Sequence, residues 1–467
     1  MIPPSCSDFV SPTVADLSAL EADPRLARRA QHLVAKWRDR PAMGFPEVFE
    51  NEAGLAAAYR FFNNQGLCFE TLIAPHVRGT LERAGPDVLL SLEDTTTFTF
   101  GGAKKRQGLG RINTNDQGFL GHFALLAKAD GSRAPLGMAA AELWVRSAKK
   151  GKREKSGRQE DKESQRWERT VGHVEAVLAE GQEVIHVQDR EGDIYSSLAS
   201  MVQRNRRFVV RCIQNRRIAA NERGDHSVYD TLEGLPVLGR KIVQVSARPG
   251  SDLPERRKTH PPRKARTAEV VVTATAVTLR APDGSPKEWP PTATINVVHV
   301  FEPSPPSDEE PIEWILATTE PIATCEDVMR VVDIYATRWL IEEFFKAIKT
   351  GCAYEKRQLE TYHALTNALA ACIPIACEML ALRTLERTAP NMPASDVLDP
   401  TRIEVLRATA KRYPLPDRPT VRDALVAIAG MGGFLKRNGR PGWLTLRRGY
   451  TRLLDYEELW RTQGKDV

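Results

Sequence analysis

The stretch around which the sequence is organised runs from Val331 to Thr350 and reads VVDIYATRWLIEEFFKAIKT. Successive residues of an α-helix are rotated by about 100° around its axis. At that rotation four polar residues fall within an arc of roughly 60°: Tyr335, Arg338, Glu342 and Lys349. The apolar residues gather on a separate arc: Leu340, Ile341, Phe344, Phe345 and Ile348. The pattern predicts one helix with a packed face and a separate chemical face.

The chemical face of this helix carries a phenol, a guanidinium, a carboxylate and an ammonium group. A carboxylate can bind a divalent cation, while Arg, Lys and a Tyr hydroxyl can bind the oxygens of a phosphodiester. The alternative is an ordinary exposed face, stabilised by pairs such as Arg338 with Glu342 at the i, i+4 spacing. The helix alone leaves both interpretations open.

The composition is that of a globular protein in a reducing compartment. Its 467 residues are 42% hydrophobic and 27% charged, with a net charge of +6, so we expect about two to four domains and a large core. The seven cysteines are scattered and form no C-x-x-C pair. This spacing argues against a disulfide framework and against a structural zinc site.

The sequence predicts a cytoplasmic protein without a membrane partner. Its start, MIPPSCSDFVSP, lacks the basic segment and apolar stretch of a signal peptide. The most apolar run, Ala368 to Leu382, contains Pro374 and Glu378 and is too short to cross a bilayer.

Residues from about 14 to 85 are expected to form helices. One apolar series has helical spacing: Leu26, Ala30, Leu33 and Val34. Further helices are predicted from Leu55 to Phe62 and from Phe69 to Ala84. A helical module with basic faces is typical of a DNA-binding domain, and a helical cap on the next domain is the alternative. Composition does not decide between them.

The next segment alternates between predicted strands and helices. Strands are expected at Asp87–Asp94, His122–Ala129, Met138–Val145, Glu183–Asp189 and Arg207–Ile213. The second and third strands are separated by the turn Asp130-Gly131-Ser132, and helices are expected at about Lys162–Glu180 and Ile194–Arg204. Three strands, a helix, a strand, a helix and a strand is the order of a ribonuclease-H-like mixed sheet. The predicted fold class is therefore α/β.

A β-rich insertion from about 214 to 319 separates this sheet from the helix that carries Glu342. Its alternating runs are Val270–Ala281 and Ala293–Glu302, and its segment Glu255–Thr267 is strongly basic. The tail from Thr361 to Val467 is predicted to be helical, with Pro-containing joints. We therefore expect an N-terminal domain over residues 1–85, a catalytic domain over 86–360 and a C-terminal domain over 361–467.

Three carboxylates are candidates for chemistry on DNA. Asp94 and Asp189 each end a predicted strand, and Glu342 lies on the helix described above. Mg²⁺ is usually held by a few carboxylates, and two such ions can assist an in-line displacement at phosphorus. The alternatives are a capping role for Asp94 beside Thr95 and an ion pair of Asp189 with Arg190.

These residues carry a resemblance to a known family. The pattern Tyr335-x2-Arg338-x3-Glu342-x6-Lys349 resembles the YREK signature of the bacterial cut-and-paste DDE transposases of the insertion-sequence-four family, the Tn-five type. Two stretches resemble the first and second acidic motifs of that family: Leu92-Glu93-Asp94-Thr95-Thr96 and Asp189-Arg190-Glu191-x-Asp193. Three more are similar to further stretches of it: Phe208-Val209-Val210-Arg211, Glu313-Trp314-Ile315-Leu316 and Met431-Gly432-Gly433-Phe434.

The resemblance implies a ribonuclease-H-like core with a β insertion, an N-terminal domain that recognises the transposon ends, and a C-terminal helical dimerisation domain. It implies that Asp94, Asp189 and Glu342 hold two Mg²⁺ ions, for which Mn²⁺ is expected to substitute. The residues that would hold transposon-end phosphates are Tyr335, Arg338, Lys349 and Arg211.

Trp314 matches the indole that supports a base turned out of the duplex in the hairpin-forming members of the family. A Trp packed within a strand is the alternative. At the N-terminus, Asp23-Pro24-Arg25 follows the Asp-x-Arg pattern of the family only loosely. Glu343 is a rival of Glu342 as the third acid, although it lies about 100° further round the helix.

The expected function is Mg²⁺-dependent strand cleavage, hairpin formation and strand transfer by a homodimer bound to double-stranded transposon ends and target DNA in the bacterial cytoplasm, at the nucleoid. One alternative is a catalytically silent, transposase-derived regulator that binds DNA. Another is a structure-specific nuclease on the same fold. A glycoside hydrolase with paired acids would not require the Arg, Lys and Tyr around Glu342.

Overall fold

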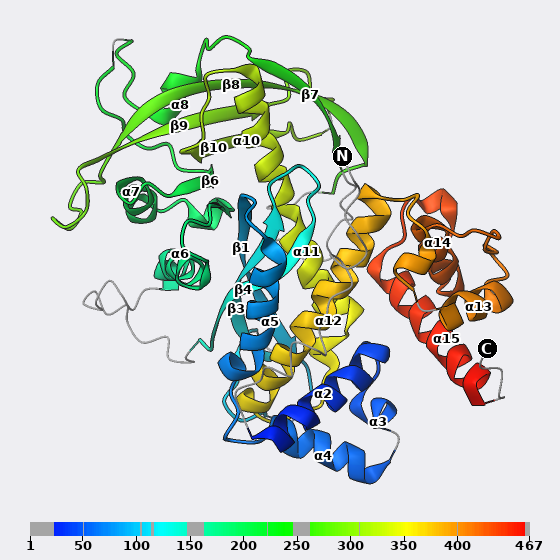
Figure 1. Cartoon of the computed structure of the whole chain (residues 1–467). Coiled ribbons are helices and arrows are strands. Elements are labelled where there is room, and N and C mark those ends of the chain that lie inside the picture. Colours follow the sequence, from blue (N-terminus) through cyan, green and yellow to red (C-terminus); the bar gives the residue numbers. More distant parts are fainter. Residues whose placement is uncertain are drawn as a thin grey trace.

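The computed structural model describes residues 23–49, 51–102, 105–113, 116–146, 163–221, 223–245, 262–307, 309–398 and 400–462, with the side chains of 438, 458, 461 and 462 left out. A long twisted sheet runs through the molecule, with helices on both of its faces and a helical C-terminal unit at one side (Figure 1). The expected basic loop at 255–267 and the start of the N-terminal helices lie largely outside these residues.

The sheet has ten strands in the order β2-β3-β1-β5-β6-β10-β9-β8-β7, and β4 pairs with β3. Its first half comprises β1 (Leu89–Phe100), β2 (Gly110–Arg111), β3 (Gln117–Lys128), β4 (Pro135–Trp144), β5 (Val184–Gln188) and β6 (Arg207–Cys212). In this half β1 pairs antiparallel with β3 and parallel with β5, and β5 pairs parallel with β6. Because β1, β5 and β6 run in one direction, their carboxyl ends meet at one edge of the sheet.

The insertion continues this sheet. It contributes β7 (Gly239–Val245), β8 (Arg266–Arg280), β9 (Thr292–Phe301) and β10 (Glu313–Thr318), and α8 (Val228–Leu232) precedes them. Strand β10 pairs antiparallel with β6, and β9, β8 and β7 follow outward. The four strands beyond β6 in the sheet therefore all come from the insertion.

Two helical layers cover the two faces of the sheet. On one face lie α6 (Arg166–Val177) and α7 (Tyr195–Gln203). On the other lie α5 (Phe69–Ala84), α11 (Trp339–Lys346) and α12 (Tyr362–Thr388), as Figure 1 shows. Side chains of a strand alternate between faces, and on β3 His122 contacts Trp167 of α6 while Phe123 contacts Phe344 and Phe345 of α11. The alternation on β3 places successive residues in two different packed layers.

Strand β1 is longer than the sequence predicted. It runs for 12 residues, through Thr95 to Phe100, so Asp94 lies within the strand and not at its end. The register with β3 continues from Leu89 to Phe100 without interruption. The prediction of a strand that ends at Asp94 was wrong, because pairing with β3 carries the strand past the two carboxylates.

The predicted helix at 331–350 is divided in two. Helix α10 (Cys325–Thr337) ends before Arg338, α11 (Trp339–Lys346) begins after it, and a π-helical turn follows at Ala347–Gly351. The predicted packed face is confirmed, with five buried residues: Leu340, Ile341, Phe344, Phe345 and Ile348. The prediction of a single uninterrupted helix was wrong. The break falls at Arg338, whose guanidinium binds Asp94 on β1.

The N-terminal helices are α2 (Pro24–Asp39), α3 (Phe45–Val48), α4 (Glu52–Phe62) and α5 (Phe69–Ala84). Helix α5 packs against β4 and α12, and the backbone N–H of Met138 donates to His76 on α5 at 3.1 Å. The buried guanidinium of Arg357 donates to the carbonyl oxygens of Pro41 and Cys352 at 2.7 and 2.6 Å, and also to that of Met43. These bonds fix the N-terminal helices to the rest of the protein.

The C-terminal helices are α12 (Tyr362–Thr388), α13 (Pro400–Thr409), α14 (Val421–Met431) and α15 (Trp443–Thr462). Helix α12 has 27 residues, longer than the apolar run seen in the sequence, and it alone among the described helices has the length and composition to span a membrane. However, 83% of its most apolar window is buried inside the protein. Its apolar character is accounted for by a position in the core.

Candidate active site

Arg338 joins two of the three predicted acids. One guanidinium nitrogen donates to Asp94 Oδ2 at 2.9 Å, and the other donates to Glu342 Oε1 at 2.6 Å. Asp94 reaches this point from β1, while Glu342 reaches it from the first turn of α11. The side chains of Arg338 and Asp94 are 13% and 17% exposed, so the interaction lies in a largely water-excluded site.

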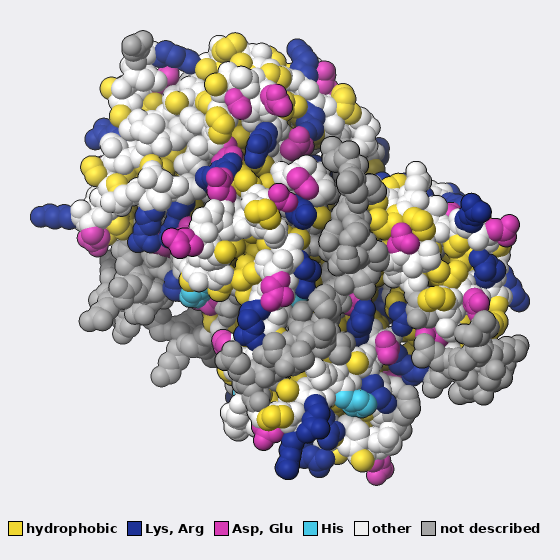
Figure 2. Space-filling view, viewed as in Figure 1, with side chains coloured by type: hydrophobic (Ala, Val, Ile, Leu, Met, Phe, Trp, Pro, Cys, Tyr) yellow, Lys and Arg dark blue, Asp and Glu magenta, His cyan; other side chains and the backbone are white. Residues whose placement is uncertain are grey.

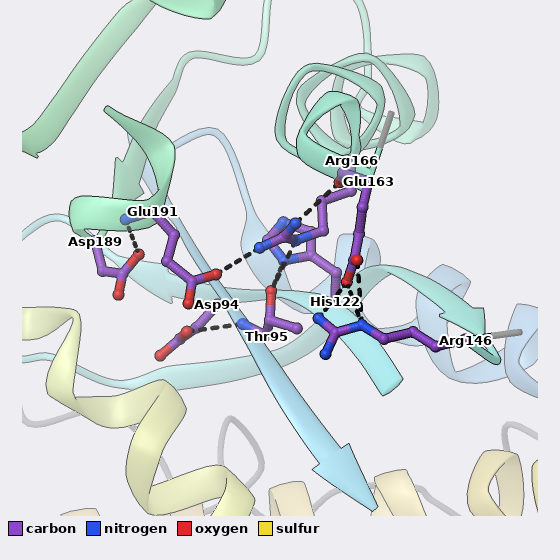
Figure 3. Close-up of polar contacts among 8 residues, drawn as sticks. All are labelled: Asp94, Thr95, His122, Arg146, Glu163, Arg166, Asp189 and Glu191. Atoms are coloured by element: carbon purple, nitrogen blue, oxygen red, sulfur yellow. Dashed lines mark hydrogen bonds and ion pairs between the residues drawn. The ribbon is translucent and has the colours of Figure 1, made fainter. Parts of the chain in front are cut away.

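Asp189 lies beside Asp94, although Asp94 is within β1 and Asp189 follows the last residue of β5. Glu93 and Gln188 are paired in the parallel register of β1 and β5, so Asp94 and Asp189 are the next residues along two neighbouring strands. Asp189 Oδ1 accepts the backbone N–H of Glu191 at 2.8 Å, at the start of a short 3-10 turn. Figure 3 shows the two carboxyl groups on the same side of the site, with the Glu191 carboxylate next to them, toward Arg166.

The ionisation of Asp94 reflects this crowding of acids. Burial raises the pKa of the Asp94 carboxyl to about 7, Arg338 lowers it, and the charges of Asp189 and Glu342 raise it. One guanidinium therefore does not balance three carboxyl groups. Excess negative charge in a buried site favours the binding of a cation.

Tyr335, Trp314 and Arg211 form a cluster beside the acids. The rings of Tyr335 and Trp314 are 5.5 Å apart, edge to face, and the Arg338 guanidinium lies 5.9 Å from the Tyr335 ring. Burial raises the pKa of the Tyr335 phenol, whereas Arg338 and Arg211 lower it. Arg211 also donates to the carbonyl oxygen of Glu313 at 3.1 Å. Trp314 is only partly buried, at the end of β10.

Lys349 contacts β1 three residues beyond Asp94, at Thr97. It belongs to the π-helical turn after α11, and its ammonium donates to the carbonyl oxygen of Thr97 at 2.7 Å. Burial lowers the pKa of Lys349, and Glu355, at 3.9 Å, raises it. Of the four residues of the predicted chemical face, Arg338 and Lys349 bind β1 directly. Glu342 binds Arg338, and Tyr335 packs against Trp314 of β10.

Glu343, the rival acid, points elsewhere. It is 5% exposed and binds the Trp443 indole N–H at 2.9 Å, Lys346 at 2.9 Å and Arg383 at 3.5 Å. Burial raises the pKa of Glu343, but Arg383 and Lys346 outweigh burial and hold it below its usual value. Its charge is already neutralised, and it fixes α11 to α12 and α15.

The donor chemistry of the acids fits a hard divalent cation, because carboxylate oxygens are its preferred protein ligands. As the side chains stand, no three acidic, His or Cys residues of the described chain are arranged to hold a metal. Arg338 bonds to both Asp94 and Glu342. The Arg338 guanidinium therefore supplies the positive charge between these two carboxylates.

Comparison with known protein families identifies two domains. Residues 18–67 match the family described as transposase DNA-binding, and residues 200–376 match the family described as transposase DDE domain. The chain is a DDE transposase. It is thus a DNA-binding enzyme of phosphoryl transfer on DNA, and the DDE domain implies a ribonuclease-H-like core and the use of divalent metal ions.

The matched segments divide the predicted site. Arg211, Trp314 and the four residues of the helix lie within the DDE match, whereas Asp94 and Asp189 precede it. The DNA-binding match covers most of α2 to α4. On α2 the exposed side chains include Arg25, Arg28 and Arg29, and Figure 2 shows Lys and Arg side chains gathered over these helices at the bottom of the transposase. These cations can contact DNA phosphates.

Sequence reasoning did not single out Arg166, which lies against the first two acidic motifs on the opposite face of β1. Its guanidinium contacts Thr95, next to Asp94, and Glu191, two residues after Asp189. No motif in the sequence marks this arginine, because it depends on the approach of three distant segments. Its position at the start of the helix after β4 was the only available signal.

Proposed function

We propose that this transposase is a cut-and-paste enzyme of the insertion-sequence-four type, which excises its element at terminal inverted repeats and joins it to target DNA. The observation that supports this most strongly is the arrangement of Arg338 between Asp94 and Glu342, with the charge of Asp189 acting on Asp94. The electrostatic influence of Asp189 and Glu342 on Asp94 supports the proposal that these three acids act together. No covalent enzyme intermediate is required, so no nucleophilic side chain is needed.

Asp94, Asp189 and Glu342 are the residues proposed to hold two divalent ions, Mg²⁺ or Mn²⁺. When bound, such ions activate an attacking oxygen and neutralise charge at phosphorus and on the leaving oxygen. In the DNA-free chain Arg338 holds Asp94 and Glu342 near each other, with side chains 17% and 29% exposed. Because the pKa of Asp94 is raised to about 7, part of the protein carries a proton on this carboxyl group at neutral pH, and a bound cation would displace it.

The cationic and aromatic neighbours are proposed to hold the DNA. Arg338, Lys349 and Arg211 would bind phosphates of the transposon end, and the Tyr335 hydroxyl would donate to a phosphate oxygen. The partly exposed Trp314 ring, packed on Tyr335, would support an unpaired base by stacking. For Arg338 this role requires release of at least one of its two carboxylates when cations and DNA bind.

The proposed reaction has four transfers at phosphorus. Water attacks a phosphodiester at the transposon end, and the 3′-oxygen leaves as a hydroxyl group. That hydroxyl attacks the opposite strand and displaces the 3′-oxygen of the flanking DNA, which leaves a hairpin on the transposon end. A second water opens the hairpin and restores the 3′-hydroxyl, which then attacks target DNA and displaces a target 3′-oxygen.

The domain roles in this proposal follow the three segments of the chain. Residues 1–85 bind the transposon ends, residues 86–360 carry out catalysis, and residues 361–467 mediate dimerisation, so that a homodimer pairs two ends. The surface arginines of α2 support the first of these roles. The site of action proposed for the enzyme is the bacterial cytoplasm, in association with the nucleoid.

The test is replacement of Asp94, Asp189 or Glu342 by Ala, one at a time. Each variant should bind transposon-end DNA as the parent does in a gel shift. Mg²⁺-dependent nicking should fall by about a thousandfold or more, because bound cations contribute several kcal/mol to such transition states. The matched control is Asp87→Ala, an exposed acid two residues before β1 whose partner is Lys128, which should nick at the parental rate.

Nicking by the Asp94, Asp189 or Glu342 variant at the rate of the control would exclude that residue from the catalytic set. A strand-transfer assay with precut ends distinguishes a transposase that joins DNA from a nuclease that only cleaves. An absence of joined product alongside normal cleavage would contradict the cut-and-paste proposal.

A further inference from the structure

Arg166 approaches β1 from the face opposite Arg338. It is the first residue of α6 and is 9% exposed. Its guanidinium donates in three directions: Nε to Thr95 Oγ1 at 3.0 Å, Nη1 to the carbonyl oxygen of Glu163 at 2.9 Å, and Nη2 to Glu191 Oε2 at 2.5 Å. Figure 3 shows the guanidinium bonded to Thr95 on the strand that carries Asp94, and to Glu191, which reaches it from the turn that carries Asp189.

The two side chains that Arg166 binds belong to the residues that orient the acids. The backbone N–H of Thr95 donates to Asp94 Oδ1 at 2.7 Å, and the backbone N–H of Glu191 donates to Asp189 Oδ1 at 2.8 Å. One guanidinium therefore holds both residues whose backbone donors fix the carboxylates. Movement of Arg166 would change the orientation of both acids and the separation between them.

The contact with Thr95 has a defined direction. The Thr95 hydroxyl accepts from Arg166 and so can donate its own proton to His122 Nδ1, 2.9 Å away. Burial lowers the pKa of His122, as do the charges of Arg166 and Arg169, so the ring is neutral and its Nδ1 is available as an acceptor. This order of bonds holds the Thr95 side chain in one rotamer.

The guanidinium is also enclosed by aromatic rings. Its carbon lies 5.8 Å from the centre of the Trp144 ring and 5.5 Å from that of Trp167, and His122 contacts Trp167 at 4.4 Å. Cation–π contacts and the three hydrogen bonds together restrict the orientation of the fork. An ammonium group at this position could not bind Thr95 and Glu191 in the same geometry.

We infer that Arg166 is a positioning residue for Asp94 and Asp189: it sets the spacing of the two carboxylates through Thr95 and Glu191. The inference rests on the proposed role of the acids as cation ligands. Partners that orient ligating carboxylates from behind typically contribute about 10- to 100-fold to metal affinity or activity. Arg166 would therefore tune cation binding without contact with cation or DNA.

The experiment compares Arg166→Lys with Arg169→Lys. Arg169 lies one turn further along α6 and pairs with Glu142 on β4 at 2.5 Å, and its replacement by Lys keeps the positive charge. The first variant should bind Mn²⁺ about 10- to 100-fold more weakly in the DNA-free protein, measured by electron paramagnetic resonance. Its kcat for end cleavage should fall by a similar factor, while KM for end DNA and Tm match those of Arg169→Lys.

Equal Mn²⁺ affinity in Arg166→Lys and Arg169→Lys would overturn the inference. If Arg166→Lys melts well below the control, Glu191→Gln replaces it, because this side chain is 58% exposed and lies at the other end of the ion pair. Glu191→Gln should also weaken Mn²⁺ binding, and parental affinity would overturn the positioning role. Active Asp94→Ala would refute the proposed function itself, whereas inactive Asp94→Ala with fully active Arg166→Lys would refute only the role of Arg166.

Discussion

Glu93 and Asp94 are consecutive residues of β1, but they lie on opposite faces of the sheet and in opposite electrostatic surroundings. Glu93 is fully buried on the α6 face. Its Oε1 lies 2.7 Å from His186 Nδ1 and accepts from Ser91 at 2.9 Å, while its Oε2 accepts from Gln188 at 2.7 Å. Asp94 is partly exposed on the α11 face, with Arg338 as its ionic partner.

The cluster around Glu93 is neutralised from within the chain. His186 lies between Glu93 and Glu175, and Glu175 also pairs with Arg206 at 2.5 Å. Burial alone lowers the pKa of His186, but the charges and hydrogen bonds of Glu93 and Glu175 raise it to about 9, so the imidazole is protonated at neutral pH. Two carboxylates are thus matched by two cations.

The cluster around Asp94 has three acids and only Arg338 bridging two of them. The consequence is visible in the raised pKa of Asp94, whereas the matched acid Glu175 has a lowered pKa because His186 and Arg206 outweigh its burial. A balanced cluster stabilises the fold and needs nothing from outside. An unbalanced one lowers stability and gains from an external cation, as sites of function commonly do.

The largest expected effect is on stability, with opposite signs at the two neighbouring residues. Glu93→Gln leaves the buried imidazolium of His186 without its closest partner and should lower the free energy of unfolding by about 3 kcal/mol. Asp94→Asn removes a carboxylate whose ionisation the folded state disfavours, and at pH 8 it should raise the free energy of unfolding by about 1 kcal/mol. Urea denaturation at pH 8 without divalent ions measures both.

Equal losses in the two variants would show that Asp94 is as structural as Glu93, and the comparison would fail. Thermal unfolding of Asp94→Asn with added Mg²⁺ sharpens it further. The parent should be stabilised by the ion, whereas the variant should gain less, because it has lost one proposed ligand.

The second prediction concerns pH. The pKa of His186 is about 9 in the folded protein and 6.5 in its ordinary state, so the folded state binds a proton more tightly. Its contribution to stability is complete below pH 6.5 and is lost as pH rises through 9. The Tm of the parent should therefore decrease as the pH is raised from 6.5 to 9. The slope should flatten in Glu93→Gln, because the charge of Glu93 is the largest influence that raises this pKa. An unchanged slope of Tm against pH in Glu93→Gln would mean that a group other than His186 causes the pH dependence.

Much of the α/β order could be predicted from sequence, because it depends on local patterns. The apolar runs that became β5 and β6, and the helix Phe69–Ala84, appear within a residue or two of their expected bounds. The longer extent of β1 was missed, since TTTFTF has strand character but follows two carboxylates. The break at Arg338 has no Gly or Pro to mark it, and it coincides with a contact to a strand 244 residues away in the chain.

The candidate site divides in the same way. Spacing within one segment indicated the shared face of Tyr335, Arg338, Glu342 and Lys349, and resemblance indicated the two aspartates. The catalytic and DNA-binding roles of all these residues stay predictions. Glu343 could be rejected only once the structure showed its contact with Trp443. The environment of Arg166 could be seen only in the fold, because it is formed by α6, β1 and the turn after β5. Sequence patterns record neighbours along the chain, and these contacts arise between distant segments.

The smallest expected effect separates the two roles of Arg338. In the DNA-free protein its guanidinium competes with a cation for Asp94 and Glu342, so Arg338→Gln should tighten Mn²⁺ binding by about tenfold, the equivalent of one charged hydrogen bond. End cleavage should nevertheless fall, because the same residue is proposed to bind a phosphate. The control is Lys346→Gln on α11, which removes an exposed partner of Glu343 and should leave Mn²⁺ affinity unchanged. Weaker Mn²⁺ binding in Arg338→Gln would mean that the arginine holds the acids in place for the cation. In that case both arginines that flank β1 would serve the same purpose, and the contrast between an internal counter-ion on one face and a positioning residue on the other would be lost.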